Sequence, residues 1–171
     1  MTTPVPTPGT APALFEWTDD LSVSIEEIDN QHKVLIGIIN QLFLAVAHRK
    51  SDKVIGEILD ALTDYTRTHF ELEENLMRSA GYGGEAFETH LAIHRAFVEK
   101  IEAIAHKVMV ENKAVSFELM NYLKHWLRDH IMLTDKEYAQ ALRQAGFSTR
   151  SWEDSARSVA RARERPWWKF W

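Results

Sequence analysis

The chain has 171 residues, with no cysteine, eight histidines, 25 Asp or Glu residues and a formal net charge of −5. This length favours one domain with short extensions, and a hydrophobic fraction of 45% is ordinary for a soluble globular protein. The absence of cysteine excludes thiolate catalysis, cysteine-ligated zinc and iron–sulfur clusters. The negative charge argues against nucleic acid as a partner, because phosphate binding needs a basic surface. Imidazole with carboxylate remains, and non-haem iron uses this ligand set.

The N-terminal segment predicts an extension of the folded body. Residues 1–12 hold four of the five prolines and no Lys or Arg. This composition is typical of a flexible arm and differs from a signal or transit peptide. The longest apolar stretch, Val34 to Ala47, is interrupted by polar residues and is too short to span a bilayer. We therefore expect a cytoplasmic protein.

Helical periodicity runs from Ser24 to Gly146. Ser24 followed by Glu27 forms a capping-box pattern that predicts the start of a first helix. Helix boundary signals then predict a second helix from Ser51 to Gly81, a third from about Glu85 to Glu111, and a fourth from near Ser116 to just before Gly146. Four long helices with short loops predict an all-α, up-down-up-down antiparallel four-helix bundle.

Five histidines and two carboxylates are distributed over all four expected helices. They are His32 on the first helix, His69 and Glu73 on the second, His90 and His94 on the third, and His130 and Asp135 on the fourth. An i,i+4 pair places both side chains on one helix face. A single metal cannot use seven such ligands, whereas two adjacent octahedral irons can. We therefore predict a centre of two iron ions with an oxo or hydroxo bridge.

The spacing of His130 and Asp135 differs from that of the other pairs. Residues five apart are rotated by roughly 140° about an ideal α-helix. We therefore expect that Asp135 does not bind one metal in the manner of an i,i+4 partner. Its carboxylate would reach a second metal, or span two, from further along the bundle.

Other metal sites fit the sequence less well. Ferritin-like carboxylate sites need Glu-x-x-His motifs on two helices, and a zincin needs His-Glu-x-x-His; the sequence contains neither motif. A facial triad of two histidines and one carboxylate would leave most of these residues unexplained. His48, His106 and His125 have no comparable partner, and we expect them at the surface or in a supporting role.

The combined pattern resembles the hemerythrin family, and bacterial hemerythrins in particular. The matching stretches are Phe15-Glu-Trp17, Ile28-Asp-Asn-Gln-His32, His69-Phe-Glu-Leu-Glu-Glu74, His90-Leu-Ala-Ile-His94 and Trp126-Leu-Arg-Asp-His130-Ile-Met-Leu-Thr-Asp135-Lys-Glu-Tyr138. The resemblance implies that His90, His94 and His130 hold one iron and that His32 and His69 hold the other, which keeps an open position for dioxygen. It also implies that Glu73 and Asp135 bridge the two irons.

By similarity to the family, a dioxygen pocket is formed by Leu35, Phe70, Trp126 and Leu133. Plain core packing is the competing interpretation of these four residues, and the two roles are compatible. Glu74, Asp29 and Gln31 are candidates for orienting the ligands, because a ligating histidine usually donates its other ring N–H.

The C-terminal segment differs from the bundle in composition. Residues 150–171 contain six Lys or Arg against three acids, and four of the six tryptophans. Tryptophan with basic residues suits a membrane surface, and it also suits a protein interface. A tail that folds back on the bundle or stays disordered is the alternative. We divide the chain into an arm (1–20), a bundle (21–146) and this tail (147–171), and predict membrane-surface or protein docking through Trp152 to Trp171.

The resemblance implies reversible dioxygen binding for transport, storage or delivery, without enzymatic turnover. In that family the diferrous pair passes two electrons to dioxygen, and release reverses the step. Two alternatives stay open: a sensor whose diiron state alters the arm or tail, and an enzyme that handles peroxide or nitric oxide. We expect a monomer, with an oligomer as the alternative.

Overall fold

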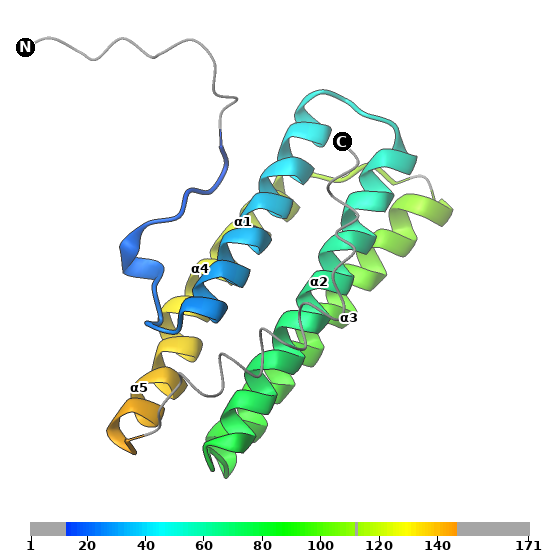
Figure 1. The fold of residues 1–171 in the computed structure, drawn as a ribbon. Helices are drawn as coiled ribbons and strands as arrows, with labels where there is room; N and C mark the ends of the chain where they lie inside the picture. Colours follow the sequence, from blue (N-terminus) through cyan, green and yellow to red (C-terminus); the bar gives the residue numbers. More distant parts are fainter. Residues whose placement is uncertain (1–12, 112, 147–171) are drawn as a thin grey trace, which may run out of the picture.

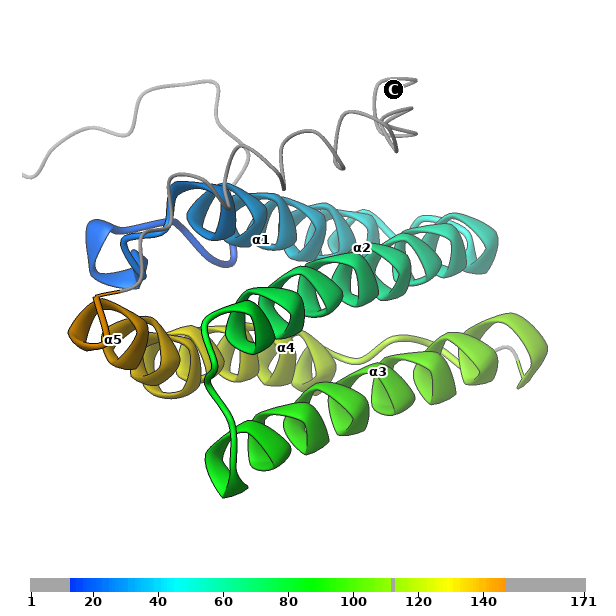
Figure 2. The same cartoon turned by 60° about the horizontal axis from the view of Figure 1, so that its bottom comes forward.

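The computed structural model describes residues 13–111 and 113–146, and this part of the chain contains helices and no strand. The helices are α1 (Glu26–Ala47), α2 (Asp52–Ser79), α3 (Glu85–Glu111), α4 (Phe117–Asp129) and α5 (Lys136–Gln144). A short 3-10 turn (Asp19–Leu21) precedes α1, and a π-helical segment (His130–Asp135) continues α4 into α5. Neighbouring helices run in alternating directions (Figures 1 and 2), which confirms the predicted four-helix bundle.

Local groups mark the start of α2, the end of α2 and the start of α4. The Ser51 hydroxyl accepts the Val54 N–H at 3.4 Å at the start of α2, and the Ser116 hydroxyl accepts the Leu119 N–H at 3.4 Å at the start of α4. Gly81, with φ of 73°, follows α2 and adopts the left-handed conformation that glycine tolerates. The predicted limits of these helices are confirmed.

The start of α1 is built differently from the predicted capping box. Ser24 has a φ of 63°. The N-cap residue of α1 is Ile25, and it provides no side-chain hydrogen bond to the helix. Instead, the Asp29 carboxylate accepts the Val23 N–H at 2.8 Å and the Ser22 hydroxyl at 2.6 Å. The capping-box prediction is therefore wrong, because a carboxylate inside the helix binds the segment that leads into it.

The bundle half remote from α5 has an apolar core. Leu42, Leu59 and Leu123 are fully buried there. Helices α2 and α3 approach closely at Gly56, where an added Cβ atom would lie 1.9 Å from the Met109 Sδ. Any side chain at position 56 would require the Met109 side chain, which is 45% exposed, to move aside.

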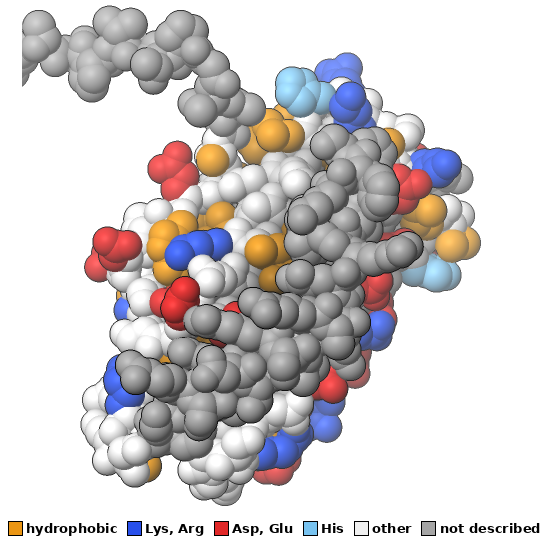
Figure 3. Space-filling model, in the orientation of Figure 1, with side chains coloured by type: hydrophobic (Ala, Val, Ile, Leu, Met, Phe, Trp, Pro, Cys, Tyr) orange, Lys and Arg blue, Asp and Glu red, His pale blue; other side chains and the backbone are white. Residues whose placement is uncertain are grey.

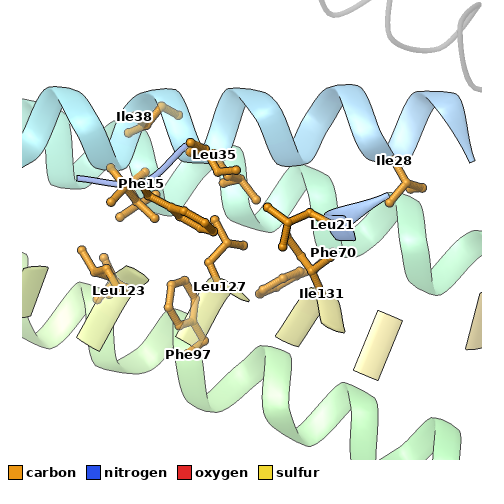
Figure 4. Close-up of a cluster of buried hydrophobic side chains, with 14 of the residues drawn as sticks. Phe15, Leu21, Ile28, Leu35, Ile38, Phe70, Phe97, Leu123, Leu127 and Ile131 are labelled. Carbon is orange, nitrogen blue, oxygen red and sulfur yellow. The ribbon is translucent and has the colours of Figure 1, made fainter. Parts of the chain in front are cut away.

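Part of the segment before residue 21, which we assigned to the arm, packs on α1. The Asn40 side chain accepts the N–H groups of Leu14 at 2.9 Å and Phe15 at 3.0 Å, and it donates to the Phe15 carbonyl at 2.8 Å. Phe15 is buried and joins a cluster with Leu35 and Leu127 (Figure 4). An apolar anchor and three hydrogen bonds therefore hold this segment on α1.

On the face seen in Figure 3, the described residues present basic and acidic side chains interspersed with hydrophobic ones. Among the described residues, no helix is both long enough and apolar enough to cross a membrane. The Trp-rich tail lies outside the described residues, and its docking stays a prediction.

Candidate metal centre

All seven predicted ligand residues meet inside the bundle. Helix α1 supplies His32, α2 supplies His69 and Glu73, α3 supplies His90 and His94, and the π-helical segment supplies His130 and Asp135. Each is buried, and the most exposed of them retains 4% of its accessible surface. Because about one helix turn separates i and i+4 residues, the pairs His69 with Glu73 and His90 with His94 each present two donor groups to the same side of a helix.

The donor atoms form two groups that share one carboxylate. The first contains Glu73, His90, His94, His130 and Asp135, and the second contains His32, His69 and Glu73. Within each group, the candidate donor atoms lie within 4.8 Å of one another. The geometry thus offers two adjacent positions for cations.

Both carboxylates lie between the two sets of histidines. The Glu73 Oε2 is 3.4 Å from the His94 Nε2, and the Glu73 Oε1 is 3.9 Å from the His32 Nε2. The Asp135 Oδ1 is 3.1 Å from the His130 Nε2, and the Asp135 Oδ2 is 3.4 Å from the His32 Nε2. Each carboxylate could therefore coordinate a cation at either of the two positions.

The π-helical segment corrects our expectation for Asp135. We predicted that five residues of α-helix would turn His130 and Asp135 away from one another. In the structure, the Lys136 N–H donates to the Ile131 carbonyl five residues earlier, which is the π-helical hydrogen bond. The wider turn brings residues i and i+5 to the same face. One ligand group therefore contains both His130 and Asp135.

The buried polar atoms fit a bound metal. The Nε2 atoms of His90, His94 and His130 converge, at 2.9 Å between His90 and His94 and 3.1 Å between His94 and His130. Several donor atoms at the centre are buried without a hydrogen-bond partner among the described residues, and they are His32 Nε2, His69 Nε2, Glu73 Oε2 and both Asp135 oxygens. Unpaired buried polar atoms are costly, and a shared cation would satisfy them.

The electrostatics of the site favour neutral imidazole, the form that binds metal. Burial lowers the pKa of His69 to about 3, and burial also lowers the pKa values of His32 and His130. Burial together with the Glu73 charge raises the pKa of Asp135 well above its usual range. Burial also opposes ionisation of Glu73, but the surrounding imidazoles, foremost His69, hold the Glu73 pKa well below its usual range.

Three polar side chains form hydrogen bonds with the candidate ligand residues. The His69 Nδ1 lies 3.0 Å from the Gln31 Oε1, and the His94 Nδ1 lies 3.2 Å from the Glu74 Oε1. Because both partners are acceptors, each ring carries its proton on Nδ1, and its Nε2 lone pair faces the centre. The Tyr138 hydroxyl donates to the Glu73 Oε1 at 2.8 Å.

Sequence reasoning identified Gln31 and Glu74 as candidates for orienting the ligands, but it gave Tyr138 no role. Tyr138 lies three residues after Asp135 in the matching stretch, and this helical spacing was the available signal. Asp29, the third candidate, binds the segment before α1 instead.

Aromatic rings pack directly on two of the ligand histidines. Phe70 stacks on His94 with ring centroids 3.6 Å apart and planes 3° apart. Trp126 stacks on His130 with centroids 4.5 Å apart and planes 13° apart. These stacking contacts restrict the orientation of the two imidazoles.

Leu133 does not line the interior, in contrast to our prediction. Leu35 and Phe70 are buried and Trp126 is half-buried, but 70% of the Leu133 surface is exposed. The π turn directs His130 and Asp135 inward, and Leu133, which lies between them in sequence, faces outward. The exposed histidines His48, His106 and His125 lie outside the centre, which confirms our expectation for them.

The fold and the buried donors together define a four-helix bundle with a histidine-rich site for two metal ions. Comparison with known proteins identifies the family. Residues 23–142 match the family model described as Hemerythrin HHE cation binding domain. The chain therefore belongs to the hemerythrin family, whose members bind dioxygen through two non-haem irons.

Bacterial and animal proteins are similar to this chain. Bacteriohemerythrin of Pseudomonas aeruginosa is 36% identical over 129 residues, which cover 75% of this chain and 82% of the relative. Bacteriohemerythrin of Stenotrophomonas maltophilia is 34% identical over 131 residues, covering 77% and 83%. A hemerythrin of Sipunculus nudus is 31% identical over 139 residues, covering 81% and 98%. A crystal structure of wild-type hemerythrin superposes with a TM-score of 0.70 at 31% identity, covering 76% of this chain and 98% of that one.

Proposed function

We propose that this protein binds dioxygen reversibly at a diiron centre, and that it stores or delivers dioxygen. The observation that supports the proposal is the convergence of five buried histidines and two buried carboxylates on two adjacent positions. The residues fit iron, because imidazole and carboxylate together suit non-haem iron, and thiolate is absent. His90, His94 and His130 would hold one ion, His32 and His69 the other, and Glu73 and Asp135 would bridge them.

The two positions differ in the number of histidines available to each. One group contains three histidines and the other contains two. If both carboxylates were shared, an iron at His32 and His69 would have fewer protein ligands and would keep a position for an exogenous molecule. When bound, the iron pair supplies the electrons that reversible dioxygen binding requires.

The side chains around the centre restrict access by water and larger molecules. Leu35 lies one helical turn after His32 on α1 and is buried. Phe70 follows His69 directly and is also buried. Apolar side chains at this place favour a small apolar molecule over a polar second substrate, which supports binding rather than turnover.

Anaerobic reduction followed by dioxygen titration tests this function. We expect two irons per chain, one dioxygen per pair of irons, and optical changes that reverse when dioxygen is removed. Fewer than two irons, or complete oxidation on first contact, contradicts the proposal. Steady consumption of peroxide or nitric oxide by the reduced protein would instead support the enzymatic alternative.

A further inference from the structure

Two ligand histidines are backed by partners of different charge, and this difference bears on the proposed diiron centre. His69 donates through its Nδ1 to the neutral amide of Gln31, at 3.0 Å. His94 donates through its Nδ1 to the carboxylate of Glu74, at 3.2 Å. The Nδ1 atoms of His32 and His130 have no partner among the described residues. The group of three histidines therefore has an anionic partner, and the group of two has a neutral one.

Glu74 is well placed to act as a fixed negative charge. It follows Glu73 on α2, and its side chain is 19% exposed at a groove between α2 and α3. Its second carboxylate oxygen is 3.2 Å from the Arg78 Nη2, one helical turn later. The Arg78 contact and the hydrogen bond to His94 use different oxygens, so the carboxylate is oriented by both. The stacked Phe70 ring in turn holds the His94 plane.

A carboxylate that accepts the imidazole N–H makes that imidazole a stronger electron donor than an amide does. Stronger donation stabilises ferric iron relative to ferrous iron, because the ferric ion carries the larger charge. Hydrogen bonding around a metal site is one of the means by which proteins set reduction potentials. We propose that Glu74 is a positioning residue that lowers the reduction potential of the iron held by His90, His94 and His130, whereas Gln31 leaves its partner iron without such an effect.

The isosteric variant Glu74→Gln tests this role, with Glu99→Gln as the matched control. Glu99 lines the same groove from α3, so its substitution removes an equal charge without changing the partner of His94. Spectroelectrochemical titration of the iron-loaded proteins gives the midpoint potential, and iron analysis shows whether the centre is intact. We expect Glu74→Gln to favour the reduced form by about tenfold, or about 59 mV for a one-electron step, with little change in Glu99→Gln.

A second variant reverses the sign of the expected shift. Gln31 also donates to the Glu27 Oε1 at 3.3 Å, so the exchange Glu27→Gln with Gln31→Glu preserves this pair and the net charge. It places a carboxylate on His69, and we expect it to lower the midpoint potential. A purely structural role for these positions would not produce shifts of opposite sign.

The inference rests on the proposed diiron function, and the outcomes separate the two. A protein with two irons and reversible dioxygen binding, in which Glu74→Gln and Glu99→Gln have equal potentials, overturns the role of Glu74 alone. Shifts of the midpoint potential in the same direction in Glu74→Gln and in the exchange variant also overturn the role of Glu74 alone. A wild-type chain that binds fewer than two irons overturns both proposals.

Discussion

The two halves of the bundle differ in the polarity of the side chains that the helices bury. In the half remote from α5, fully buried side chains such as Leu59 and Leu123 are apolar. In the other half, His32, Glu73 and Asp135 are equally buried, and several of their polar atoms have no partner among the described residues. Burial of leucine stabilises the fold, whereas burial of unpaired polar atoms destabilises it. The apolar half therefore supports a polar half that is completed only when metal binds.

Removal of iron gives the largest effect expected from this difference. Ligands that bind only the folded state stabilise it by about 4 kcal/mol at a thousandfold excess over Kd, and the buried donors here lose their partner with the metal. For a chain of this size we expect the melting temperature to fall by about 10 °C after anaerobic reduction and chelation. Circular dichroism melts before and after chelation, with iron restored as the control, measure this. Equal melting temperatures before and after chelation would show that bound metal does not stabilise the fold.

Substitutions in the two halves should respond differently to metal. Leu59→Ala removes a buried apolar side chain and should lower the free energy of unfolding by about 3 kcal/mol with or without iron. Glu73→Gln removes a buried charge, so we expect it to leave the metal-free protein as stable as wild type or more stable, while iron content falls. Urea unfolding of both variants in both metal states gives the four values. If metal-free Glu73→Gln lost as much stability as Leu59→Ala, the proposed difference between the apolar and polar halves would be contradicted.

Acid should destabilise the metal-free polar half. Burial lowers the pKa of His69 to about 3, below its ordinary value of 6.5, so between these values the unfolded chain binds a proton that the folded one does not. Stability therefore falls as the pH decreases from about 6.5 towards 3, by up to about 1.4 kcal/mol per pH unit for each such histidine. His32 and His130 shift in the same direction. Urea midpoints of the metal-free protein across this range, compared with His69→Gln, measure the slope, which the variant should reduce.

Access to the open iron position gives the smallest expected effect. Leu35→Ala enlarges the space beside His32, admits water, and should accelerate spontaneous oxidation by about tenfold, or about 1.4 kcal/mol of barrier. Leu133→Ala is the matched control, because 70% of Leu133 is already exposed. Optical decay of the dioxygen-bound form in air gives both rates. Equal acceleration in the two variants would mean that Leu35 does not restrict access.

The features predicted correctly from sequence depend on local chemistry. Ser51 and Gly81 mark helix ends through their own side-chain and backbone properties, and these limits agree with the structure. The i,i+4 pairs His69 with Glu73 and His90 with His94 follow from helix geometry alone, and each pair joins one donor group.

The features that were missed depend on neighbouring segments. Ser24 lost its expected capping role because Asp29 binds the preceding chain, and the left-handed backbone at Ser24 has no sequence signal in a serine. The π turn at residues 130–135 cannot be distinguished from an α-helix by periodicity over so short a stretch. This one change of helix geometry placed Asp135 in a donor group and turned Leu133 outward.

Anomalous diffraction at the iron edge, from crystals of the iron-loaded protein, would locate the metal ions directly. We expect two iron peaks, one beside His90, His94 and His130 and the other beside His32 and His69. Glu73 and Asp135 would lie between the peaks. A single peak, or iron bound away from these residues, would contradict this expectation.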